Sequence, residues 1–181
     1  MKTRKRLTLR LSDSGLRYGQ KVLKEMQKES DRATAILLGA ELDDILHQIL
    51  SKRLLPPKSK SGRLLEQDSP IGSFSARIEL TYRLGLIHPM VHGELQLIRK
   101  IRNEFAHKKV GVSFKTQPVS QLTAELFFPK AINQLFLKKH KEVFNPDSRS
   151  RFVCSGALLL WRLTILHERV KRLRLSPEIE S

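Results

Sequence analysis

The sequence has little of what defines several large classes of protein. Among 181 residues there is one cysteine, Cys154, so the chain cannot contain a disulfide framework. Aromatic residues make up only 6% and there are nine glycines, which argues against a sandwich or barrel rich in tight turns. Apolar residues still amount to 40% and are mostly aliphatic, which is enough for one helical domain with a real core.

Long hydrophobic runs are also missing. The most apolar stretch, residues 152–166, is interrupted by Arg162 and is shorter than the roughly 20 residues of a transmembrane helix. The first ten residues, MKTRKRLTLR, are basic but lack the apolar run that follows in a signal peptide. We therefore expect a cytoplasmic protein with no membrane partner, in which Cys154 is a small core residue.

Negative charge is scarce as well. The chain has 18 Asp and Glu against 34 Lys and Arg, a formal net charge of +16. Such a surface attracts polyanions, so nucleic acid (RNA or DNA) is the first expected partner and a protein partner is the alternative. The predicted nucleic-acid-binding residues lie in the N-terminal arm, in the loop after residue 107 and in the last third of the chain: Arg4, Lys5, Arg6, Lys108, Lys109, Lys138, Lys139, Arg169 and Arg172.

Apolar spacing and capping residues divide the chain into a basic arm (1–11), a helical bundle domain (12–175) and a tail (176–181). Asp31 is expected to cap a strong helix, and Gly85 to take the left-handed position after another helix that Ser73 or Ser75 begins. The predicted fold class is all-α, a single bundle with a long C-terminal helix; its helices are expected over residues 12–30, 31–53, 73–84, 89–107, 118–126, 130–141 and 148–173.

The segment most suggestive of chemistry is IRNEFAHKK, residues 101–109, at the end of the helix expected over 89–107. Asn103 and His107 share a helix face, whereas Arg102 and His107 lie about 140° apart around the axis. Two copies of the helix, packed across a dimer axis, would bring all three side chains together. His could move the proton of a ribose 2′-hydroxyl, Arg could stabilise the phosphoryl transition state and Asn could orient the phosphate, without a metal.

We therefore predict Arg102, Asn103 and His107 as catalytic candidates in a homodimer, with no metal and no cofactor. The alternative for the same residues is structural: Phe105 packs in the core, while Arg102 and Asn103 are solvated or cap the end of the helix.

A family resemblance adds to this interpretation. The motif resembles the Arg-x4–6-His motif of the HEPN superfamily, which implies a dimeric, metal-independent ribonuclease, such as a toxin or defence protein. The upstream segment SPIGSFSARIELTYRLGLI (69–87) resembles the signature of the mannitol operon repressor family, which also precedes a helix ending in Arg-x4-His. The positions that match this signature are Gly72, Ser75, Arg77, Tyr82, Leu84, Gly85 and Ile87.

The second resemblance covers residues 33–126, about half of the chain. It implies an all-α bundle and a bacterial regulator that represses expression, either on nucleic acid or through a nucleic-acid-bound partner. A HEPN-type ribonuclease and a protein–protein interaction module remain the alternatives. Two weaker candidates are a helix-turn-helix over residues 74–102 and a metal site from His88, His92 and Glu94; burial of the apolar stripe and helix capping argue against them.

Overall fold

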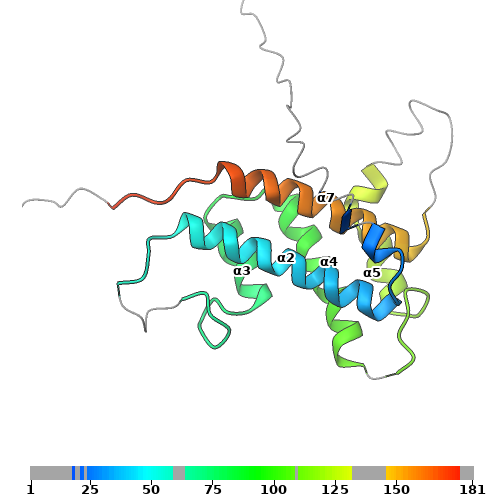
Figure 1. The fold of residues 1–181 in the computed structure, drawn as a ribbon. Helices are drawn as coiled ribbons and strands as arrows, with labels where there is room; N and C mark the ends of the chain where they lie inside the picture. Colours follow the sequence, from blue (N-terminus) through cyan, green and yellow to red (C-terminus); the bar gives the residue numbers. More distant parts are fainter. Residues whose placement is uncertain are drawn as a thin grey trace, which may run out of the picture.

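The computed structural model describes residues 18, 21–22, 24–58, 64–108, 110–131 and 146–175, and these residues contain helices and no strand. The predicted all-α fold class is therefore confirmed. The bundle is built from α2 (Asp31–Arg53), α3 (Phe74–Arg83), α4 (Pro89–His107), α5 (Val119–Glu125) and α7 (Ser148–Arg169) (Figure 1). No helix in these ranges is long and apolar enough to cross a membrane.

The long helices α2 and α7 pack side by side and run in the same direction (Figure 1). Arg149 at the start of α7 pairs with Asp31 at the start of α2, and Lys52 near the end of α2 reaches the backbone oxygen of His167 at 2.6 Å. Gly156 permits their close contact, because a Cβ atom there would lie only 2.2 Å from Cδ2 of the buried Leu38.

Helices α3 and α4, which were expected over residues 73–84 and 89–107, form a hairpin. The Ser73 hydroxyl caps α3 by accepting from the Ala76 N–H at 3.1 Å. Gly85 has a φ of +67°, and two backbone bonds, from Gly85 N–H to Tyr82 O and from Leu86 N–H to Thr81 O, close the Schellman motif. His88 then caps α4 and Pro89 occupies its first turn.

Helical spacing places Leu95, Ile98, Ile101 and Phe105 on one face of α4, and all four are fully buried. The ring of Phe105 contacts Phe114, whose ring in turn contacts Phe152 of α7, with centroid distances of 5.0 and 5.2 Å. This row of rings joins α4, the loop after it and α7.

Three element boundaries differ from the expectation. Ser30, not Asp31, caps α2, with its hydroxyl accepting from the Ala33 N–H at 3.2 Å, because the Asp31 carboxylate binds Arg149 and the Phe114 N–H instead. α7 ends at Arg169 rather than near residue 173. α5 begins at residue 119, with Pro118 before its first turn. Of the helix expected over 12–30, residues 18, 21–22 and 24–26 are helical, whereas residues 27–30 are not; most of the helix expected over 130–141 lies outside the described residues.

Candidate functional site at the C-terminal end of α4

Arg102 and Asn103 lie side by side near the end of α4. Nη1 of Arg102 donates to Oδ1 of Asn103 at 3.1 Å, and both side chains are partly buried. The stem of Arg102 crosses α2 at Gly39, where an added Cβ would lie 2.7 Å from Cγ of Arg102. A glycine on α2 thus makes room for the arginine, and the arginine and asparagine form a preassembled pair.

His107 is the last residue of α4 and is exposed. The hydrogen bonds and ion pairs of the described chain do not join His107 to Arg102 or Asn103. One copy of the chain therefore pairs Arg102 with Asn103 and leaves His107 without a bond to either, although Asn103 and His107 share a helix face. The separation of Arg102 from His107 agrees with their spacing of about 140° around the helix axis.

Arg32, near the start of α2, holds the end of α4 in place. Its guanidinium donates to the backbone oxygens of Phe105 and Lys108, the latter at 2.6 Å. Carbonyls in the last turn of a helix have no partner within the helix, so this arginine satisfies them from outside. Glu104 and Lys108 add an ion pair of 2.6 Å on the same turn. The sequence analysis missed Arg32, because nothing in its local pattern shows which helix end it reaches.

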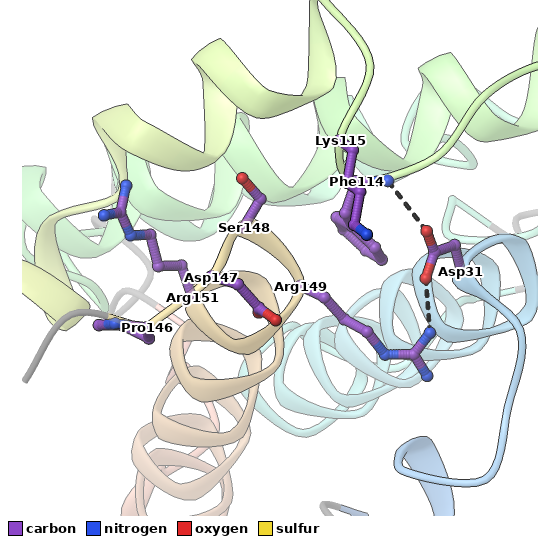
Figure 2. A pocket seen from close by; sticks show the side chains of 8 residues that line it. All are labelled: Asp31, Phe114, Lys115, Pro146, Asp147, Ser148, Arg149 and Arg151. Atoms are coloured by element: carbon purple, nitrogen blue, oxygen red, sulfur yellow. Dashed lines mark hydrogen bonds and ion pairs between the residues drawn. The ribbon is translucent and has the colours of Figure 1, made fainter.

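A pocket of about 520 Å³ opens where α2 and α7 begin (Figure 2). Its charged lining residues are Asp31, Lys115, Asp147, Arg149 and Arg151; Phe114, Pro146 and Ser148 complete the lining. Three cations against two carboxylates make the lining basic.

Contacts within the protein already use much of the hydrogen-bonding capacity of Arg149 and Asp147. Arg149 donates to Asp31 Oδ1 at 2.6 Å, to Met26 O at 2.7 Å and to Thr34 Oγ1 at 2.9 Å (Figure 2 shows the first). The Ser150 N–H bonds to the Asp147 carboxylate at 2.7 Å, which lowers the pKa of Asp147 and caps α7. Arg149 and Asp147 thus mainly fix the start of α7.

The residues of the family signature build the hairpin rather than a reactive site. Arg77 bonds to Asp43 of α2 at 2.6 Å and to Leu65 O at 2.9 Å, tying α3 to α2 and to the preceding loop. Gly72 lies against that loop, where a Cβ would be 2.2 Å from Glu66 O. The other signature positions lie on α3 or in the turn after it: Ser75, Tyr82, Leu84, Gly85 and Ile87.

His88, His92 and Glu94 do not converge on a metal position. His88 caps α4, and His92 contacts Glu79 at 3.1 Å. Glu94 is 2% exposed and accepts from the Phe127 N–H at 2.8 Å, the Phe128 N–H at 3.2 Å and the Ser155 hydroxyl. Among the residues that the structure describes, no group of three His, Cys, Asp or Glu could hold a metal ion. The buried role of Glu94 was not visible in the sequence.

The predicted nucleic-acid-binding residues fall into two groups. Arg169 and Arg172 are exposed at the end of α7 and just beyond it, while Lys108 is exposed beside Glu104. The remaining predicted residues lie outside the described residues: Arg4, Lys5, Arg6, Lys109, Lys138 and Lys139.

No protein-family model matches the sequence, and a comparison with curated proteins gives no match either. Among solved structures, a chain in the X-ray structure of the MtlR–HPr complex from Escherichia coli is similar, with a TM-score of 0.57. The similarity covers 82% of this chain and 99% of that chain at 19% sequence identity. At this identity the similarity shows a shared helical fold, in agreement with the fold that the mannitol-repressor resemblance implied.

Proposed function

We propose that the protein is an MtlR-like helical regulator that binds nucleic acid, or a partner already bound to nucleic acid, and thereby represses expression. The observation that carries this proposal is a net charge of +16 on a fold similar to that of a chain in the MtlR–HPr complex. A protein of this charge releases counterions from a nucleic acid when it binds, so its affinity should fall steeply as salt rises.

A protein partner is the main alternative. The similar solved structure is a complex of two proteins, which supports a protein-binding role for the shared fold. A module of this kind would form a saturable complex with its partner and would leave RNA and DNA unbound near physiological salt.

A dimeric, metal-independent ribonuclease is the second candidate function, because the Arg102–Asn103 pair lies on the same helix end as the exposed His107. In this mechanism His107 of one copy would act as general base or acid on the ribose 2′-hydroxyl. The Arg102–Asn103 pair would stabilise the phosphoryl group in the transition state. The helix geometry requires two copies for all three groups to meet, so this function needs a homodimer.

One experiment on the purified chain separates the candidates. Fluorescently labelled RNA and DNA are incubated with protein in EDTA, and both binding and cleavage are followed over a range of salt concentrations. The variants are His107→Ala and Arg102→Ala, and His47→Ala on α2 serves as the matched control. Salt-dependent binding that survives His107→Ala, with intact RNA, supports the regulator.

Cleavage by the wild type and His47→Ala, and by neither of the other two variants, would instead assign the ribonuclease. Intact RNA together with no binding of either nucleic acid would reject both roles and favour the protein-binding module.

A further inference from the structure

The chain beyond α7 is an ordered, extended segment that lies along the end of α2. The Leu173 N–H donates to Arg53 O at 2.7 Å, and Nη1 of Arg53 donates to Lys171 O at 3.0 Å. Val170 is buried and Leu173 is partly buried, so two apolar side chains fix the segment to the bundle. We call residues 169–175, which are the last residue of α7 and the extended segment after it, the basic strap.

The basic strap exposes four cations and contains no acidic residue. Val170 and Leu173 turn toward the protein, and the charged side chains around them face solvent: Arg169, Lys171, Arg172 and Arg174. The acidic residue adjoining it in sequence is Glu168, on the last turn of α7. Lys52 and Arg53 of α2 lie beneath the strap and bind its backbone or the last carbonyls of α7, so they hold the strap while its own cations stay exposed.

The dimensions of the strap suit a phosphate backbone. An extended chain advances about 3.3 Å per residue, so residues 171–174 span about 10 Å, which is the axial length of about three base-pair steps of a duplex. Because its backbone is already fixed, the strap would lose mainly side-chain freedom on binding. Guanidinium groups also match phosphate oxygens in a bidentate geometry.

The side chains of the strap fit nucleic acid better than a protein surface. Protein interfaces depend on buried aromatic and aliphatic anchors, and the strap offers one exposed apolar residue, Leu175. It has no aromatic side chain on which a base could stack, so its contacts would go to phosphates and would be independent of sequence.

We propose that the basic strap is a binding surface for the phosphate backbone of nucleic acid, and this inference rests on the proposed function. The strap supplies affinity and fixes orientation, while any reading of bases is left to other parts of the molecule.

The test compares two triple variants that remove equal charge. One is Lys171→Gln, Arg172→Gln and Arg174→Gln in the strap. The control is a set of exposed lysines elsewhere: Lys28→Gln, Lys100→Gln and Lys115→Gln. Binding to a duplex DNA, to a single-stranded RNA and to polyglutamate is measured by fluorescence anisotropy as a function of salt, and circular dichroism checks that both variants keep the helicity of the wild type.

Loss of three phosphate contacts should lower the slope of log affinity against log salt by about 2 to 3. Over the decade between 1 M and 0.1 M salt, that change of slope corresponds to about a hundred- to thousand-fold loss of affinity at 0.1 M. The control triple should lose much less, and the DNA and RNA arms show which nucleic acid the strap prefers.

Three outcomes would overturn the inference. Equal losses in the two triple variants would mean that overall charge, not the strap, drives binding. An unchanged strap variant beside a binding wild type would reject the strap alone and leave the proposed function standing. A wild type that binds neither nucleic acid, or binds polyglutamate more tightly than both, would reject the proposed function together with the strap.

Discussion

Replacing Gly156 by alanine tests the packing between α2 and α7. The new Cβ would lie 2.2 Å from Cδ2 and 2.7 Å from Cγ of Leu38, which is fully buried. Carbon atoms normally pack at about 3.5–4.0 Å, so the two helices would have to separate or Leu38 would have to leave its position. Overpacking of this kind costs about 1–3 kcal/mol, against a gain of about 0.5–1 kcal/mol for alanine over glycine in a helix.

We therefore expect Gly156→Ala to lower the free energy of unfolding by about 1–2 kcal/mol, measured by urea denaturation. Gly93→Ala is the matched control, because Gly93 lies within α4 and its Cβ would meet no atom within 4 Å. The control should gain about 0.5–1 kcal/mol from helix propensity alone. If both variants changed stability by the same amount and sign, the close contact between α2 and α7 would be refuted.

The double variant Gly156→Ala with Leu38→Ala sharpens the test. Leu38→Ala alone should cost about 2–5 kcal/mol, because it leaves a cavity in the core. The alanine methyl at position 156 would partly fill that cavity. The double variant should therefore lose less unfolding free energy than the two single variants lose together. Simple additivity would show that the two side chains do not meet.

Three further predictions concern polar groups of the bundle. Glu94→Ala leaves the N–H of Phe127 and other buried donors without an acceptor and should cost about 3 kcal/mol or more in unfolding experiments, whereas Ser155→Ala should cost about 1 kcal/mol. Arg149→Met removes the link between the starts of α2 and α7 and should cost about 2–4 kcal/mol; a loss under about 0.5 kcal/mol would contradict that role. The lowered pKa of Asp147 means that its charge stabilises the fold above the pKa of the unfolded state, and that this stabilisation is lost as pH falls through the folded pKa. The stability gap between wild type and Asp147→Asn should therefore close on acidification; a gap that widened would refute the assignment.

Local sequence signals predicted the hairpin well because every signal is carried by neighbouring residues. Ser73, Gly85 and Pro89 act on the backbone within a few positions of themselves, so their effects are readable without the fold. The buried stripe of α4 likewise follows from helical spacing. The MtlR-like similarity in fold agrees with a signature that lies mostly on this hairpin.

Long-range contacts account for the expectations that failed. Asp31 is a good capping residue by type, yet Arg149, more than a hundred positions away, engages its carboxylate, and Ser30 caps α2 instead. α7 stops at Arg169, and beyond it the Leu173 N–H bonds to the backbone oxygen of Arg53 of α2. No local pattern records either partner, just as none shows that Arg32 reaches the end of α4.

These long-range contacts also change how the net charge should be interpreted. At the starts of α2 and α7, Arg32 and Arg149 bind backbone oxygens and a carboxylate, so much of their capacity for hydrogen bonding is used within the protein. At the other end of the same helix pair, Lys52 and Arg53 do the same and leave the cations of the basic strap facing solvent. A count of Lys and Arg therefore overstates the charge available to a polyanion near the Arg102–Asn103 pair. At the strap, the count of Lys and Arg is closer to the charge that a polyanion can reach. Binding is therefore expected to respond to substitutions in the strap, and any cleavage to substitutions of the Arg102–Asn103 pair.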